Sequence, residues 1–203
     1  GKVVLGQTGC TGVQLLVNQP LLDTSGNELI AFTQTGGAVN QVNITNCGTS
    51  AAPVIGTSGG DTDIPLRISV KGAAFIYAGT RVIESAILSS DNTAGNITYS
   101  VQNVISNILD RDPNGSARAD ATPSAASIVT ALKDIGSQAS WELVIRNQGA
   151  ITEDITITGG TGVSFSGSAV VAAGSATRFL VVIDSASPGF EAITFYNLGS
   201  STF

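Results

Sequence analysis

Charged side chains are scarce in this chain, and that scarcity limits how it can fold as a soluble molecule. Of its 203 residues, 12% are charged and 42% are hydrophobic, whereas about a quarter of the residues in a typical soluble domain are charged. Interfaces between obligate subunits are apolar and poor in charge. We therefore expect copies of the chain to bury apolar strand faces against one another. A β monomer with a Ser/Thr surface is the alternative.

Composition also excludes several classes of site and partner. The chain has no histidine, so it cannot carry a histidine-based triad or a histidine-ligated metal. Its net charge of −6 argues against nucleic-acid binding, which depends on Lys and Arg. The longest apolar run, Ala73–Ala78, is far shorter than the ~20 residues that span a bilayer. We predict no cofactor, no nucleic acid and no membrane insertion. With no methionine and no visible signal peptide, we expect a fragment or a processed product.

Two cysteines, Cys10 and Cys47, leave the redox compartment open. Two are too few for a disulfide scaffold or for a zinc site, which takes four ligands. A bond between them would contribute roughly 4 kcal/mol by the chain-entropy estimate. Both can equally be small buried apolar side chains.

Short strands separated by turns are predicted over the first 80 residues. The turn cluster 23–27 lies between Leu21-Leu22 and Leu29–Phe32, which predicts a hairpin. The alternation around Val42 and Ile44 predicts a second strand, and Gly56–Asp63 is predicted as a loop. The clearest alternation follows at Ile64–Lys71, which predicts a half-buried strand near a sheet edge.

The middle of the chain contains two candidate helices. Val101–Leu109 carries apolar residues at helical spacing, and 110–120 is a turn-rich connector. A second helix is predicted with Thr122 as its cap and Pro123 in its first position, ending at Gly136.

From Ser140 onward the pattern returns to strands. Trp141, Leu143 and Ile145 are expected on one face of the first strand. Further short strands are predicted around Ile155 and Ile157, Val163 and Phe165, Ala169–Ala172, Phe179–Ile183, and Ile193 and Phe195. About six strands separated by Gly/Ser turns are typical of a small sandwich or jelly roll.

Three pairs of carboxylates are the first candidates for chemistry: Asp61/Asp63, Asp110/Asp112 and Glu153/Asp154. A glycosidase needs two carboxylates that face each other across a sugar, usually among aromatic side chains, and aromatics are almost absent near these pairs. The Asp61/Asp63 loop lacks the further oxygen ligands of a calcium loop. Capping of turns explains all three pairs, so we predict no catalytic, cofactor-binding or metal-binding residue.

The remaining candidates are isolated. Trp141 could stack on a sugar, but its face is shared with Leu143 and Ile145, which favours core packing. Gly159–Gly162 lies between strands, so it cannot bind a phosphate at a helix N-terminus. Cation sites are few, and four arginines are scattered along the sequence: Arg111, Arg118, Arg146 and Arg178.

The segment DTSGNELIAFTQTGGAVNQVNITNCGTSAAPVIGTSGGDTDIPLRISVKG (residues 23–72) resembles a repeat unit of fibre proteins from tailed phages and large DNA viruses. The matching elements are Asp23/Gly26/Asn27/Glu28, Ala38–Asn40, Gly60–Asp63, Lys71-Gly72 and GKVVLG at 1–6. The last of these is similar to the end of a preceding unit.

A second resemblance covers residues 98–199. The segment ITYSVQNVISNILDRDPNGSARADATPSAASIVTAL, followed by SWELVIRN, GTGVSFSGS and RFLVVIDSASPGFEAITFYNLG, is similar to the C-terminal module of viral fibre and capsid-spike proteins. Together the two resemblances cover most of the chain.

These resemblances imply a mainly β, homotrimeric fibre. Residues 1–80 would be a shaft-type repeat with the strands of three chains wound around one axis, and 81–122 a neck. Residues 123–203 would be a sandwich or jelly-roll-like head led by a helix. The implied role is not enzymatic: it is attachment, at the virion surface, to a host receptor (a glycan or an envelope component) alongside other virion proteins. The alternatives are a tailspike-type polysaccharide-degrading enzyme and a purely structural capsid decoration or filament subunit.

Overall fold

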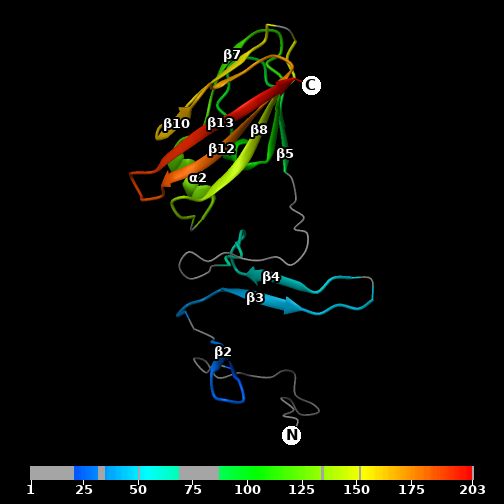
Figure 1. Cartoon of the computed structure of the whole chain (residues 1–203), viewed down its shortest axis with the longest axis vertical. Helices are drawn as coiled ribbons and strands as arrows, with labels where there is room; N and C mark the ends of the chain where they lie inside the picture. The colour runs from blue at the N-terminus through cyan, green and yellow to red at the C-terminus, as the bar shows by residue number, and fades with distance from the viewer. Residues whose placement is uncertain are drawn as a thin grey trace. The chain divides into compact units, whose positions relative to one another are not determined.

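The computed structural model is mainly β, and it describes residues 21–31, 35–49, 51–68, 87–133, 135–150 and 152–202 (Figure 1). The chain divides into two compact units, Gly1–Ile76 and Tyr77–Phe203. No helix in these ranges is long and apolar enough to cross a membrane.

A tight hairpin opens the described part of the first unit. Strands β1 (Leu21–Leu22) and β2 (Glu28–Ile30) pair antiparallel. The Asp23 carboxylate closes the turn by accepting hydrogen bonds from the backbone N–H groups of Ser25 and Asn27, both at 2.8 Å. The side-chain amide of Asn27 also donates to this carboxylate and, with the backbone donors, lowers the pKa of Asp23. The predicted hairpin is confirmed.

A second hairpin pairs β3 (Asn40–Thr45) with β4 (Val54–Gly59). The strand around Val42 and Ile44 is confirmed, whereas the loop predicted at Gly56–Asp63 is wrong over its first four residues, which belong to β4. The turn-forming composition of these residues is overridden by pairing with β3.

The clearest strand pattern of the sequence does not form a strand over 64–68. The chain is held beside β4 by a single bond in which the Thr57 hydroxyl donates to the carbonyl of Ile64, at 2.8 Å. Alternation predicts which side chains share a face, but a strand also needs a partner strand. The described part of the first unit offers none. The end of the predicted strand, 69–71, lies outside the described residues.

Apolar side chains of the first unit are left uncovered. Val42, Ile44 and Ile55 share one face of the second hairpin, and Ile44 and Ile55 are 82% and 63% exposed. Other exposed apolar side chains of this unit are Leu22, Leu29, Ile30, Val39, Val54, Leu66 and Ile68. An isolated two-stranded hairpin is marginally stable at best in water. This unit therefore lacks, among its described residues, a buried core of its own.

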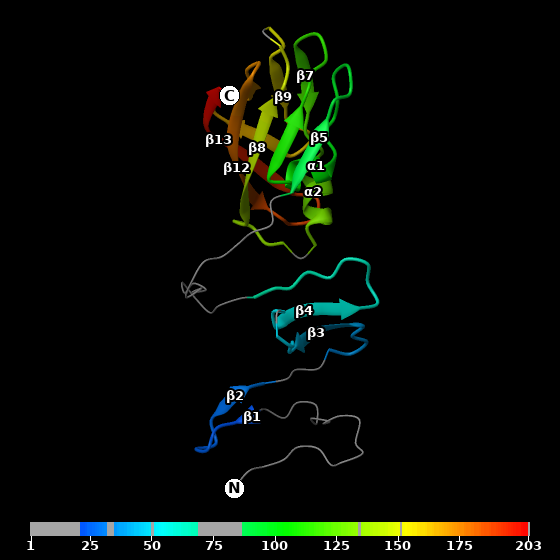
Figure 2. The ribbon, with the colours of Figure 1, turned by 90° about the vertical axis from the view of Figure 1, so that its right-hand side faces the viewer.

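The second unit is built from two sheets and two short helices (Figures 1 and 2). One sheet has the order β10-β13-β12-β8-β6-β5, and the other has the order β11-β9-β7. The elements are β5 (Leu88–Asp91), α1 (Val101–Ile105), β6 (Ile108–Arg111), β7 (Arg118–Ala121), α2 (Ala125–Ala131), β8 (Ser140–Asn147), β9 (Ile155–Thr158), β10 (Val163–Ser166), β11 (Val170–Val171), β12 (Ser175–Ser185) and β13 (Ala192–Thr202).

Both sheets mix parallel and antiparallel pairs. Strands β5, β6 and β8 are parallel neighbours, β12 is antiparallel to β8 and to β13, and β10 is parallel to β13. Parallel neighbours require crossover connections, and α1 lies in the one between β5 and β6. The mainly β class is thus confirmed, but these parallel pairs differ from the antiparallel strands of the expected jelly roll.

The core of this unit is closed within one chain. Side chains from both sheets and both helices are fully buried in it, among them Leu143, Phe179 and Phe195 of the large sheet, Ile155 of the small sheet and Ile128 of α2. The expectation that apolar faces need further copies to cover them therefore applies to the first unit and not to this core.

The segment expected to be a neck, 81–122, shares its sheets with residues 123–203 in its described part. Strands β5 and β6 extend the large sheet beside β8, and β7 pairs with β9. No boundary between units falls at 122/123, because the sheet continues across it. The strands of this segment are short, and their parallel partners lie far along the chain. Their local sequence pattern is therefore weak, which is why the sequence predicts a connector here.

Both helices are shorter than predicted. Helix α1 ends at Ile105, and Leu109, the last residue of its apolar pattern, lies in β6. Helix α2 is capped by Ser124 and ends at Ala131. The predicted cap, Thr122, instead accepts a hydrogen bond from the backbone N–H of Gly160 at 2.9 Å.

Candidate functional site

Five of the six paired carboxylates lie outside strands, and Asp110 lies in β6. Asp112 accepts from the backbone N–H of Asn114 at 2.9 Å, and Glu153 from that of Ala150 at 3.0 Å. Asp154 accepts from the backbone N–H of Ala173, also at 2.9 Å. The first two bonds confirm turn capping for Asp112 and Glu153, whereas Asp154 joins its loop to the 172–174 loop.

Asp110 and Asp61 interact with neighbouring side chains. Asp110 lies 3.2 Å from an Nη of Arg146, and Asp61 accepts from the Asn40 amide at 2.7 Å. No group of three or more His, Cys, Asp or Glu side chains that could hold a metal occurs in the described ranges. Cys47 is a free, exposed thiol, while Cys10 lies outside those ranges.

Four loops meet at one end of the second unit. The parallel strands β5, β6 and β8 all finish at this edge of the sheet, and the antiparallel strand β12 begins there. The loops at this edge are 92–96, 112–117, 148–154 and 172–174 (Figure 2). We call them the loop end. Ile151 lies outside the described residues.

A buried ion pair fixes two of these loops. The Nε of Arg111, on β6, is 2.8 Å from Oδ2 of Asp120, on β7, and both side chains are completely buried. The guanidinium also donates to the carbonyl of Thr93 and to that of Gly95, both at 2.8 Å, and to the carbonyl of Asp112. All three of its nitrogens are thereby bonded, as a buried guanidinium requires.

A buried amide fixes the other side of the loop end. Asn147, the last residue of β8, donates to the carbonyls of Glu153 at 2.8 Å and Val171 at 3.0 Å. Its amide oxygen accepts from the backbone N–H of Gly149 at 2.8 Å. The side chain therefore connects the large sheet, the 148–154 loop and strand β11 of the small sheet.

Arg118 shapes the loop 112–117 from its far end. Its Nε donates to the carbonyl of Pro113 at 2.9 Å, and its Nη groups bond the Ser116 hydroxyl and the carbonyl of Asn114. The loop backbone is consequently held on both sides, by Arg111 and by Arg118. The loop end is a pre-shaped surface presenting Ser, Asn and backbone groups.

Sequence reasoning missed the role of Arg111 and Asn147. Each lies on the core-facing side of its strand. Arg111 shares that side of β6 with Leu109, and Asn147 shares that side of β8 with Leu143 and Ile145. A polar residue at the end of an apolar alternation is the signal that would have indicated a buried polar anchor.

Tyr99 is buried beside the same ion pair. Its hydroxyl makes no hydrogen bond of normal geometry among the described residues, but the Asp120 carboxylate lies close enough to interact with it. Burial raises the pKa of this phenol, and the negative charge of Asp120 raises it further. The group is therefore neutral across the physiological range.

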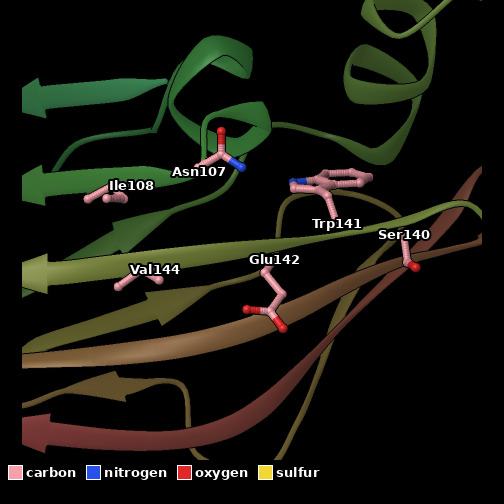
Figure 3. Close-up of a pocket in the computed structure, with 6 residues that line it drawn as sticks. All are labelled: Asn107, Ile108, Ser140, Trp141, Glu142 and Val144. Atoms are coloured by element: carbon pink, nitrogen blue, oxygen red, sulfur yellow. The ribbon is translucent and has the colours of Figure 1, made fainter. Parts of the chain in front are cut away.

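A pocket of about 400 Å³ lies at the opposite end of the unit, where β6 and β8 begin (Figure 3). It is lined by Asn107, Ile108, Ser140, Trp141, Glu142 and Val144. Trp141 is half-buried against the core, and its Nε1 donates to the carbonyl of Val104 at 2.9 Å. The predicted core packing of Trp141 is confirmed, and the part of the side chain that is not buried borders the pocket.

The glycines 159–162 serve packing between β9 and β10. A Cβ on Gly160 would lie 2.6 Å from the carbonyl oxygens of Thr122 and Pro123, next to the start of α2. This close approach explains the glycine and leaves the segment without an anion site.

Comparisons with protein-family models, curated proteins and solved structures find no match to this chain.

Proposed function

We propose that this chain is part of a homotrimeric viral fibre or capsid spike that attaches a virion to its host. The first unit would be the shaft and the second the head. Attachment would be multivalent, because three weak sites on one rigid trimer raise the effective concentration of each other's ligand. No chemistry is required of the head.

One observation carries this proposal: the apolar side chains on one face of the β3–β4 hairpin are exposed in the described part of the chain. Val42, Ile44 and Ile55 are all more than half exposed on that face, and neither strand contains a charged residue. Copies that pack these faces together would remove them from water, at about 25 cal/mol per Å² of apolar surface buried.

The head contributes a pre-shaped contact surface. The loop end is held by Arg111, Arg118 and Asn147, so little conformational entropy is lost when it binds. This favours the loop end as the surface that touches the host, and it favours adhesion over a decoration without a receptor.

Hydrolysis is less well supported than adhesion. A tailspike-type enzyme needs two carboxylates free to face a glycosidic bond. Asp112 and Glu153 are instead engaged as caps, Asp154 bonds the backbone N–H of Ala173, and Asp110 pairs with Arg146.

The mass of the chain in solution is the first test. Light scattering should give about three times 20.5 kDa for the wild type. Ile44→Asp should lower this mass, because it places a charge on the shared apolar face. Gln41→Asp adds the same charge on the opposite face of β3 and should leave the mass unchanged. A wild-type mass near 20 kDa contradicts the trimer.

Binding to host cells is the second test. The wild-type chain should bind cells and should release no new reducing ends from host polysaccharide. Ile44→Asp should bind much more weakly, since avidity is lost with the trimer. Robust release of reducing ends would favour the enzyme, and a trimer that binds no cells would favour the structural subunit.

A further inference from the structure

The pocket at the start of β8 has an open strand edge as one wall. Strand β8 pairs with β12 along residues 140–146, but β6 pairs with it only from Val144 onward. The β6-facing edge of 140–143 thus has no strand neighbour in the described structure. The backbone N–H of Val144 points to this side, where it donates to the carbonyl of Asn107 at 2.9 Å. Because strand residues alternate, the N–H and C=O of Glu142 face the same side.

Polar side chains add donors and acceptors around this edge. The amide oxygen of Asn107 accepts from the backbone N–H of Ile87 at 3.0 Å, while its Nδ2 has no partner among the described residues. Ser140 contributes a hydroxyl. The Glu142 carboxylate is held 2.7 Å from an Nη of Arg178 and is half-exposed. Figure 3 shows Asn107, Trp141 and Glu142 around one opening.

Apolar groups complete the lining. Ile108 and Val144 lie side by side on β6 and β8, and the Trp141 ring lies on the other side of Asn107 and Glu142 (Figure 3). Compact pockets that combine apolar walls with a few convergent polar groups are the usual form of small-ligand sites, and ~300 Å³ is near their lower size limit. The volume here, about 400 Å³, suits one or two small rings.

We propose that this pocket binds a neutral pyranose sugar. The hydroxyl groups of such a sugar both donate and accept, which matches the mixed set formed by the Asn107 amide, the Ser140 hydroxyl and the Glu142 carboxylate and backbone. The apolar ring face of the sugar fits against an aromatic or aliphatic wall. Acidic sugars are disfavoured, because the only charged side chain of the lining is the Glu142 carboxylate. The pocket lies at the opposite end from the loop end, so the proposal does not rest on the proposed host contact.

The position of Trp141 gives the experiment a local reporter, since it is the only tryptophan of the chain. The full chain is titrated with the methyl glycosides of glucose, galactose and mannose and with N-acetylglucosamine. Each is taken to about 50 mM, well above the ~1 mM dissociation constant of a weak small-ligand site. At least one should change the tryptophan emission saturably. Glucuronic acid should bind at least tenfold more weakly than that sugar.

Two variants test the residues that would hold the sugar. Asn107→Asp keeps the acceptor for Ile87 but removes the free donor, and Glu142→Gln keeps the shape of the side chain but removes its charge. Each should weaken binding at least tenfold. Glu28→Gln, on the exposed strand β2 of the first unit, is the matched control and should bind as the wild type does. Near-UV circular dichroism checks that all three variants are folded.

Each other outcome overturns the proposal. No saturable change in emission, with no shift of the Glu142 amide in a ¹H–¹⁵N spectrum, excludes a sugar from the pocket. Binding that survives unchanged in both pocket variants places the sugar elsewhere. Binding of an extended Val-Thr peptide in place of every sugar would assign the open edge of β8 to strand addition.

Discussion

Arg111 and Asp120 form an ion pair that crosses the core of the second unit. Their side chains come from different sheets, meet at 2.8 Å and are both fully buried. Removing one partner leaves an uncompensated buried charge, which costs about 3–5 kcal/mol. Because Arg111 also bonds carbonyls of the loop end, we expect these loops to unfold together with the core.

Asp120→Ala should lower the free energy of unfolding of the second unit by about 3–5 kcal/mol. Urea unfolding followed by near-UV circular dichroism measures this. Glu142→Ala is the control, because it breaks the exposed pair with Arg178, and exposed pairs contribute at most about 1 kcal/mol. Equal losses in the two variants would show that the buried pair is not an anchor.

Tyr99→Phe should change the free energy of unfolding at pH 7 by no more than about 1 kcal/mol, because the buried hydroxyl has no hydrogen bond of normal geometry but lies beside the Asp120 carboxylate. The two proteins should also differ at alkaline pH. The pKa of Tyr99 is raised in the folded state, so its contribution is complete below the unfolded pKa, about 10, and is lost as the pH rises above it. Wild type should then lose up to ~1.4 kcal/mol per pH unit more than the variant. Unfolding at pH 7 and at pH 11 measures both effects, and a larger loss of stability in the variant at pH 7 would mean that the hydroxyl is strongly hydrogen-bonded.

Asn147→Asp should destabilise the second unit by about 3 kcal/mol at pH 7. The substitution turns an amide nitrogen that donates to two carbonyls into a charged oxygen that faces them. Urea unfolding followed by near-UV circular dichroism measures the loss. Asn114→Asp, in an exposed turn, should stay within about 0.5 kcal/mol of wild type. A loss in Asn147→Asp no larger than that in Asn114→Asp would contradict the assignment.

Gly160→Ala should be strongly destabilising, and Gly136→Ala should not. The new Cβ at Gly160 would lie 2.6 Å from two backbone oxygens, whereas the one at Gly136 meets open space. Gly136→Ala should raise the free energy of unfolding by about 0.4–1 kcal/mol, because alanine lowers the conformational entropy of the unfolded chain. Thermal unfolding of the two variants measures the contrast, and similar melting temperatures would contradict it.

Hydrophobic periodicity predicts the strands that pack on the core well. The faces of Trp141–Ile145 and of Ile155 and Ile157 are those predicted, because each strand has one buried side. Hydrophobic periodicity fails at 64–68, where the alternation is present but no partner strand is described. It also fails at 101–109, where one apolar stripe covers a five-residue helix and part of strand β6. Pairing partners are far away in the sequence, so no local pattern contains them.

The candidate site was predicted less well than the fold. Of the carboxylates expected to cap turns, Asp112 and Glu153 do so, whereas Asp110 pairs with Arg146 and Asp61 bonds Asn40. The pocket exists because β8 extends four residues beyond the start of its pairing with β6, and no local pattern predicts that register. The anchors Arg111 and Asn147 were overlooked because polar residues are normally assigned to the surface.

The position of β13 has a consequence for synthesis on the ribosome. This strand lies between β12 and β10, and it contributes Ile193 and Phe195 to the core. A nascent chain that stops short of it leaves Phe179 uncovered and β10 without its only strand partner. The second unit must therefore stay incomplete and accessible to chaperones until residue 202 or so has left the exit tunnel, and it then closes in a single late step.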